Sequence, residues 1–387
     1  MLKVLLPAFT FLILAAEPIK IGCIIPLTGP MAKFGEMDKK SYAIALEEIN
    51  DAGGIDGRPI EIVYEDDQGK PEVAMAAAEK LITRNKVPMI IGEYSSSCAF
   101  AVAGVCQRYK TPFLNICGAA DKITQQGWNY VFRMNPPASE YPSGFKEFLK
   151  EVGLPKKIAI LFENTLFGTS SAEALKKWCE ENEIEVVMHE PYESGAIDFK
   201  PMLIKVKAKE PDVVYMVSYI MDAILLIRQS KELDINPKTF IGGAAGFTMP
   251  SFLEGAGDAA EFVISVTLWS PESGFPKAKE YYKEYEKRFG VSPDYHGAEA
   301  YASLYIVADV LKRCKSLDTE ETRKVLKETS LTTAFGPIKF EDYDSFTNQN
   351  RMSTLLLQVQ EGKYKLVWPK NIAASEYVYP VPKWSDR

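Results

Sequence analysis

Short apolar runs alternate with longer amphipathic segments along this chain, and the first such unit spans residues 19–67. It consists of an apolar strand, a loop carrying Phe34-Gly35, a long helix, a glycine turn and a second strand that ends in acidic residues. This order predicts a βαβ unit. The loop that leaves the first strand then lies at the carboxyl edge of the sheet, where open α/β folds bind small ligands.

The same alternation continues beyond this unit. Helices are predicted near residues 72–84 and 97–109, and strands over 89–92 and 113–116. Strands that alternate with helices build a parallel sheet with helices on both faces. The first part of the chain is therefore predicted to form a doubly wound α/β lobe.

A second unit of the same layout starts near Lys157. Its first loop carries Phe167-Gly168, which holds the place that Phe34-Gly35 has in the first unit. The fold class predicted from this repeat is α/β, with two doubly wound parallel-sheet lobes and a cleft between them. We expect one aromatic side chain from each first loop to point into that cleft.

The remaining segments complete these lobes. Strands over 213–217, 240–242 and 262–268 belong to the second lobe, and helices over 276–289 and up to about residue 315 return to the first. A hairpin over 352–368 and a surface strap from Pro369 end the pattern. The predicted lobes are residues 17–137 with 269–344, and 138–268 with 345–387. Three hinge crossings are expected near residues 136–137, 268–269 and 344–349.

The first sixteen residues have the pattern of a secretory signal peptide. Lys3 precedes an apolar stretch, residues 4–14, that ends in Ala15-Ala16 and is too short to span a bilayer. We expect cleavage near Ala16 and export to the periplasm; an N-terminal anchor or a first strand is the alternative. Cys23 lies inside the predicted strand rather than at a lipid-attachment position, so we expect no lipid tether.

Length and charge narrow the class further. The chain has 387 residues, which is more than one hydrophobic core usually supports, and about two domains are expected. Its 52 acidic side chains outnumber 45 basic ones, for a net charge of -7, and no long basic run occurs. This balance argues against nucleic acid as a partner.

Cysteine spacing gives no support for a metal or redox site. The six cysteines occur without a C-x-x-C pair, so neither a zinc motif nor a thioredoxin motif is present. Cys98 and Cys117 are predicted at the same sheet edge. A disulfide between them would be compatible with export to an oxidising compartment. Free buried thiols are the favoured interpretation, and no cofactor or metal is expected.

Enzyme signatures are also missing. The sequence has no G-x-S-x-G, H-E-x-x-H, G-x-x-x-x-G-K-[ST] or strand-linked G-x-G-x-x-G motif. With two histidines, no His/Cys/carboxylate cluster is evident from the sequence. Paired acids such as Asp66-Asp67 stand at a strand end and are interpreted as solvated or capping groups. The sequence therefore predicts a binding protein rather than an enzyme.

Five segments carry a family resemblance. In chain order they read PLTGPMAKFG, INDAGGIDGRPIEIVYEDD, IIGEYSSS, WNYVFRMNPP and SPDYHGAEAYASL. Together, from about residue 18 to 368, they resemble the branched-chain amino-acid-binding proteins of bacterial ABC importers, which have the type I periplasmic binding fold. The resemblance implies two lobes joined by three crossings, a ligand held in the cleft, and lobe closure sensed by a permease in the inner membrane.

The sequence of the first lobe predicts a carboxylate ligand. Ser95, Ser96 and Ser97 follow a strand and open a helix, so hydroxyls and unpaired N–H groups converge where the helix dipole favours an anion. Helix capping is the alternative role. The resemblance favours ligand binding by Ser96. It also matches the segment Cys117-Gly118-Ala119-Ala120 to the family's second carboxylate-binding turn, although Ala120 offers no hydroxyl.

The resemblance also reveals a missing charge. Amino-acid-binding members of the family carry a glutamate that pairs with the ligand's ammonium group, and the matching residue here is Ala244. An ammonium group in a closed cleft without its carboxylate costs several kcal/mol, on the order of the whole binding energy. This departure argues against an ordinary α-amino acid unless Asp121, Asp222 or Glu93 replaces the charge.

Aromatic residues occupy the other cleft positions that the alignment suggests. They are Phe34, Tyr94, Phe167 and Tyr219, and His296 joins them. Each alone is compatible with packing at a lobe edge, and His296 with a satisfied loop histidine. Together they predict a ring-lined pocket for a flat or branched apolar body with a carboxylate at one end.

Three hypotheses of function follow. The leading one is an exported, monomeric solute-binding protein that delivers a small carboxylate, aromatic or otherwise lacking an ammonium group, to an ABC permease. The second keeps this role but assigns an amino acid of the leucine, isoleucine and valine type. The third is a sensor subunit that uses the same cleft to signal to a partner.

Overall fold

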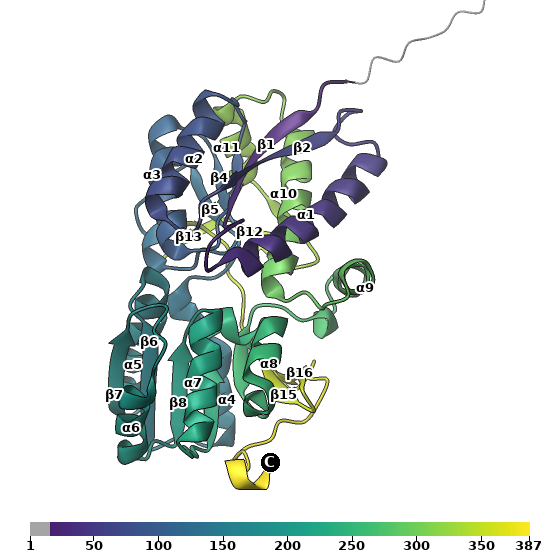
Figure 1. Ribbon diagram of the computed structural model, residues 1–387. Coiled ribbons are helices and arrows are strands. Elements are labelled where there is room, and N and C mark those ends of the chain that lie inside the picture. The colour runs from purple at the N-terminus through teal and green to yellow at the C-terminus, as the bar shows by residue number, and fades with distance from the viewer. Residues whose placement is uncertain (1–15) are drawn as a thin grey trace, which may run out of the picture.

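The computed structural model describes residues 16–387 and places them in two α/β lobes, one above the other in Figure 1. All but the last residue of the predicted signal peptide lies outside the described residues. Within the described part of the chain, no helix is long and apolar enough to cross a membrane.

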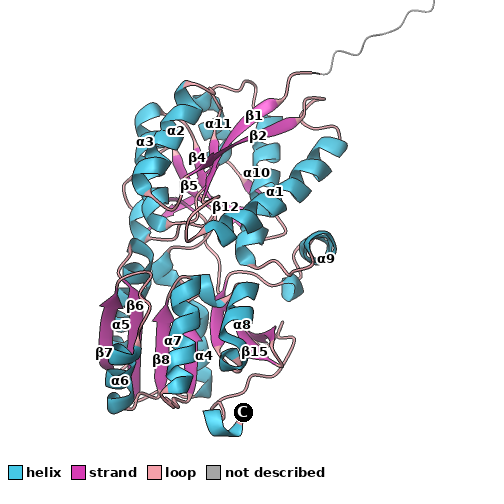
Figure 2. Cartoon of the chain, in the orientation of Figure 1, coloured by secondary structure: helices cyan, strands magenta, loops and turns pink. Residues whose placement is uncertain are grey.

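Each lobe is built on a seven-stranded sheet (Figure 2). The first sheet has the order β13-β14-β5-β4-β3-β1-β2, and the second has the order β16-β15-β10-β9-β8-β6-β7. The strands of the first sheet are β1 (Ile19–Ile25), β2 (Ile60–Asp66), β3 (Ile90–Gly92), β4 (Phe113–Asn115), β5 (Val131–Arg133), β13 (Glu341–Tyr343) and β14 (Phe346–Gln349). Those of the second are β6 (Lys157–Glu163), β7 (Glu185–Tyr192), β8 (Val213–Val217), β9 (Thr239–Gly242), β10 (Ile264–Thr267), β15 (Leu355–Gln360) and β16 (Lys363–Trp368). The first five strands of each lobe pair in parallel and in the same spatial order, so the predicted repeat is confirmed.

Helices cover both faces of the two sheets (Figure 2). The first lobe contains α1 (Ala32–Asp51), α2 (Pro71–Thr83), α3 (Ser96–Tyr109), α9 (Ala278–Phe289), α10 (Tyr295–Arg313) and α11 (Thr319–Lys327), with the short hairpin β11 (Ser330–Thr332) and β12 (Pro337–Lys339). The second contains α4 (Ser143–Val152), α5 (Leu166–Glu181), α6 (Lys200–Lys209), α7 (Ile220–Glu232) and α8 (Pro250–Ala256).

The side chains of β1 show how the first lobe is layered. Ile21, Cys23 and Ile25 pack in the core shared with α1 and α10, whereas Ile24 packs in the core shared with α2 and α3. Alternate residues of a strand point to opposite faces, and both faces are buried here. This is why the strand reads as a continuous apolar run.

The two Phe-Gly pairs lie in helices and not in loops, which corrects the prediction. Phe34-Gly35 stands in the first turn of α1, and Phe167-Gly168 in the first turn of α5. A Cβ atom on Gly35 would lie 2.0 Å from the carbonyl oxygen of Pro26, and one on Gly168 would lie 2.1 Å from that of Glu163. Glycine therefore lets each helix begin directly against the end of its lobe's first strand.

The third crossing between the lobes lies later in the chain than predicted. β14 pairs in parallel with β5 in the first sheet, with Gln349 opposite Arg133, so residues 345–349 belong to the first lobe. The crossing to β15 therefore lies between Gln349 and Leu355. The buried Arg133 guanidinium donates to Gln349 Oε1 at 2.6 Å, and Gln349 Nε2 donates to the Asn135 carbonyl at 2.6 Å. These bonds tie the third crossing to the first.

All six cysteines are free thiols. Cys98 and Cys117 are both buried and do not form the disulfide that the sequence left open. The favoured interpretation, free buried thiols, agrees with the structure.

Candidate functional site

A small cavity of about 10 Å³ lies between the lobes, where the carboxyl ends of the parallel strands of both sheets meet. This is room for about one water molecule, so the walls are closely packed. Its lining residues are Tyr94, Ser96, Cys117, Ala119, Tyr141, Phe167, Tyr219, Ala245, Tyr295 and His296. They follow β3, β4, β5, β6, β8 and β9, and two of them open α10. The cavity therefore draws on both lobes.

Six of the twelve predicted site residues line this cavity. They are Tyr94, Ser96, Ala119, Phe167, Tyr219 and His296. The structure does not place the other six in its lining: Phe34, Ser95, Ser97, Gly118, Ala120 and Ala244. Phe34 is nevertheless close, because its ring stacks on that of Tyr94 at 3.9 Å between centroids. Helix packing turns the Phe34 side chain behind Tyr94.

Four lining residues were not among the predicted site residues, although Cys117 belongs to the predicted turn: Cys117, Tyr141, Ala245 and Tyr295. Three of them adjoin residues that were singled out, namely Gly118, Ala244 and His296. Tyr141 belongs to the first crossing, which the sequence identified only as a hinge. The aromatic enrichment of the cleft was the signal that could have found Tyr141 and Tyr295.

Aromatic rings join the two lobes across the cavity. The ring centroids of Tyr94 and Tyr219 are 5.6 Å apart, and Tyr219 stacks on Phe167 at 6.2 Å. Tyr141 meets Phe167 edge to face at 5.7 Å. Burial raises the pKa of Tyr94 and Tyr219 well above the usual range, so both phenols are neutral. The Tyr94 hydroxyl is buried without a hydrogen-bond partner.

His296 presents one unpartnered nitrogen in this wall. Its side chain is 1% exposed, and its Nδ1 lies 2.8 Å from Oδ2 of Asp294, the N-cap residue of α10. Its Nε2 is buried and has no hydrogen-bond partner. With Nδ1–H donating to Asp294, Nε2 accepts from a ligand hydroxyl when the ring is neutral and donates to a carboxylate when it is charged.

Ser96 contacts the turn that the sequence analysis matched to it. Its Oγ accepts hydrogen bonds from the N–H groups of Ala119 and Ala120, each at 3.0 Å. The expected backbone donors of this turn are thus directed at Ser96, and the Gly118 N–H donates to Asn115 Oδ1. The hydroxyl proton of Ser96 remains the polar hydrogen that this turn can offer to the cavity.

The family model for periplasmic binding proteins matches residues 18–363 of this chain, across both lobes and all three crossings. The chain belongs to the periplasmic binding protein family. It is a solute-binding protein and not an enzyme.

Proteins similar to this chain are named after, or were solved with, different ligands. Leu/Ile/Val-binding protein homolog 7 of Brucella suis biovar 1 (strain 1330) is 28% identical over 384 residues, covering 95% of each chain. The LivJ protein of Streptococcus pneumoniae in complex with isoleucine is 24% identical, with a TM-score of 0.83 over 91% of this chain and 100% of that one. A solute-binding protein of Rhodopseudomonas palustris BisB5 in complex with 3,4-dihydroxybenzoic acid is 22% identical, with a TM-score of 0.80 over 90% and 95%.

No carboxylate lines the cavity of this binding protein within the described residues. Ala244 is fully buried with φ 69° and ψ -149°, a strained conformation for a residue with a Cβ atom, and it holds Ala245 in the wall. The three acids considered as substitutes point elsewhere: Asp121 Oδ1 accepts from the Ser139 N–H, Asp222 from the Gly195 N–H, and Glu93 lies outside the lining.

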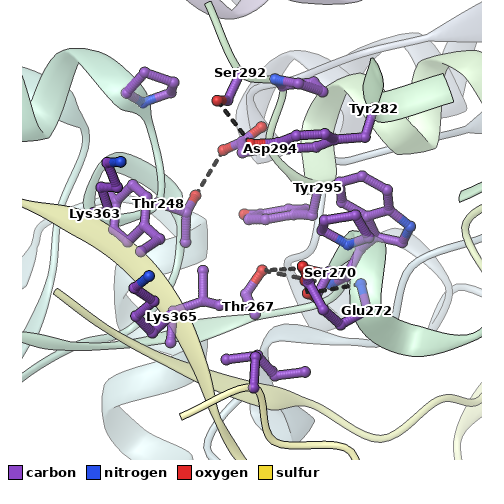
Figure 3. A pocket seen from close by; sticks show the side chains of 18 of the residues that line it. Thr248, Thr267, Ser270, Glu272, Tyr282, Ser292, Asp294, Tyr295, Lys363 and Lys365 are labelled. Atoms are coloured by element: carbon purple, nitrogen blue, oxygen red, sulfur yellow. Dashed lines mark hydrogen bonds between the residues drawn. The ribbon is translucent and has the colours of Figure 1, made fainter. Parts of the chain in front are cut away.

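A second, larger cavity of about 480 Å³ lies between the lobes beside the first. Tyr295 lines both cavities and so separates them. Figure 3 shows Lys363 and Lys365 of β16 on one side of this space and Ser270 and Glu272 on the other. Above Tyr295, Thr248 Oγ1 of the second lobe donates to Asp294 Oδ2 of the first at 2.7 Å, which holds the lobes together here (Figure 3).

Proposed function

We propose that this protein is a periplasmic solute-binding subunit that captures a small aromatic carboxylate and delivers it to an ABC permease. One observation carries the proposal: four tyrosines, a phenylalanine and His296 line the cavity, with no carboxylate in its lining. Such walls suit a flat apolar ring with few polar groups. They offer an α-ammonium group no charged partner.

Polar groups of the cavity supply the expected contacts. His296 Nε2, the Tyr94 hydroxyl and the Ser96 hydroxyl proton are the groups that a ligand's carboxylate or ring hydroxyl would engage. The 3,4-dihydroxybenzoic acid complex of the Rhodopseudomonas palustris protein supports this ligand class. The isoleucine complex of the LivJ protein and the name of the Brucella relative favour a branched-chain amino acid as the second candidate.

Lobe closure follows from the same geometry. The cavity walls come from both lobes, and the present walls leave space for about one water. A ring therefore enters only when the lobes open or the tyrosines turn. Ligand contacts with both lobes then favour the closed form, which a permease can distinguish from the open one.

The test isolates the ammonium group. Leucine and 4-methylpentanoate differ only in that group, so ligand-stripped protein is compared with each, and with benzoate and 4-hydroxybenzoate, by thermal shift and calorimetry. A ligand at 100 times its Kd stabilises the native state by about 2.7 kcal/mol. We expect stabilisation by the benzoates and none by leucine. Leucine that binds while 4-methylpentanoate and the benzoates do not would overturn the proposal and establish the amino-acid role.

A further inference from the structure

Three ligand-type side chains meet in the first lobe, in a cluster that the sequence spacing did not reveal. One oxygen of Asp67, one of Glu93 and the sulfur of Cys98 lie within 4.8 Å of one another. Asp67 follows β2, Glu93 follows β3, and Cys98 stands in the first turn of α3. All three side chains are fully buried. The expectation that no Cys/carboxylate cluster forms is therefore wrong.

Apart from a proton that they can share with each other, the two carboxyl groups of this cluster have no side-chain hydrogen-bond partner. Both oxygens of Glu93 and Oδ2 of Asp67 are buried without a hydrogen bond, while Oδ1 of Asp67 accepts from the Gly69 N–H. Among the described residues, no lysine, arginine or histidine forms an ion pair with either acid. Buried carboxyl groups are costly unless a proton or a cation compensates them. Two acids that face one thiol need such compensation.

We propose that Asp67, Glu93 and Cys98 bind a divalent transition-metal ion, and that Zn²⁺ fits the donor set best. Carboxylate oxygen and thiolate sulfur are both ordinary zinc ligands, whereas Ca²⁺ and Mg²⁺ take oxygen ligands alone. Three protein ligands leave one tetrahedral position for water. The ion supplies two positive charges to a site that otherwise holds only acidic groups.

The position of the site explains what the ion would do. It links the ends of β2 and β3 to the start of α3, the segment that carries Tyr94 and Ser96. None of the three ligands lines the cavity, so the ion contacts no captured solute. The ion would stabilise the wall of the first lobe. This structural role does not depend on which solute binds.

Cobalt gives this site a specific optical signal. The protein is unfolded in chelator, refolded with Co²⁺ or Zn²⁺ and without organic ligand, and passed through a desalting column. We expect one Co²⁺ per chain with a thiolate-to-cobalt absorption band in the near ultraviolet, and one Zn²⁺ per chain by elemental analysis. Asp67→Asn and Glu93→Gln are each expected to weaken Zn²⁺ at least tenfold.

Cys106 provides the matched control. It is a buried thiol on the same helix, and its pKa is raised by burial alone, with no neighbouring carboxyl group. Cys98→Ser should abolish the band, whereas Cys106→Ser should keep it. Absence of metal from the refolded protein, or equal binding by the two serine variants, would overturn the proposal and leave Asp67 and Glu93 as a proton-sharing pair. These readouts use no solute, so they can fail while the proposed transport function stands, and the reverse.

Discussion

His296 combines a fixed contact within the protein with one unpartnered ring nitrogen. Its backbone N–H and its Nδ1 contact Asp294 at the start of α10, which fixes the ring, and its Nε2 remains without a partner in the cavity wall. The sequence placed this histidine in the cleft but left open whether it was already satisfied. One ring nitrogen is satisfied within the protein, and the other, Nε2, has no hydrogen-bond partner.

Replacing His296 by phenylalanine is expected to weaken the binding of 4-hydroxybenzoate by about ten- to a hundredfold. A hydrogen bond to a charged group is worth about 1.5–3 kcal/mol, and phenylalanine keeps the ring but not the nitrogen. Calorimetric titration measures the change. His189→Phe is the control, because His189 lies on β7 outside the cavity and its replacement should leave Kd unchanged. Equal Kd values for both variants would remove His296 from the site.

At the scale of elements, the first helix of each lobe starts against its own first strand. Gly35 and Gly168 make this close approach, since a Cβ at either position would meet a backbone carbonyl that cannot move aside. The preceding Phe34 and Phe167 are thereby carried to the cleft, one behind Tyr94 and one in the cavity wall. The repeated Phe-Gly pair thus reflects a packing constraint, and in the second lobe it also brings Phe167 to the cavity wall.

Gly35→Ala and Gly168→Ala are each expected to lower the free energy of unfolding by at least about 2 kcal/mol, because overpacking here must shift backbone. Urea unfolding measures the change. Gly104→Ala is the control: it lies in α3, and the nearest atom to its Cβ would be in the Trp128 ring at 3.7 Å, an ordinary contact. This control should raise stability by about 0.5–1 kcal/mol. Similar gains at all three positions would contradict the packing argument.

At the scale of the whole molecule, buried acidic side chains in both lobes make the stability of the folded state depend on pH. Burial raises the pKa of Glu163 in the second lobe to about 9, with a contribution from the neighbouring Asp222. In the first lobe, burial also raises the pKa of Asp38 and Glu299 well above the usual range. The native state therefore holds protons that the unfolded chain releases above about pH 4.5. A state that binds more protons is favoured at lower pH.

The free energy of unfolding is therefore expected to be greatest near pH 5 and to fall as the pH rises towards 9, by up to about 1.4 kcal/mol per pH unit for each such group. Urea titrations at about pH 5 and pH 8 test the sign. Glu163→Gln should reduce the slope. Glu320→Gln should not, because Glu320 is exposed and its hydrogen bond to Arg323 lowers the pKa to about 2, below this window. A stability that rises across the window would refute this assignment.

Much of the architecture was predictable because its causes are local. Apolar runs bounded by helices specify buried parallel strands, and the repeated Phe-Gly pair specified two lobes before any contact was known. The same pattern, together with the family resemblance, led to six cavity residues, since side chains that follow parallel strands share one sheet edge. The two Phe-Gly pairs were wrongly predicted to lie in loops. Each helix in fact begins two or three residues before its glycine, because the glycine allows close contact with the preceding strand end.

The sequence by itself determined the α/β class, the two lobes and the aromatic character of the cleft. Only the tertiary structure decided that β14 belongs to the first sheet, that Tyr141 and Tyr295 line the cavity, and that Asp67, Glu93 and Cys98 meet. The physical reason is the separation of the contacting residues along the chain. Periodicity shows which face of an element is buried. These contacts join segments far apart in the sequence and depend on packing between elements, which no local pattern encodes.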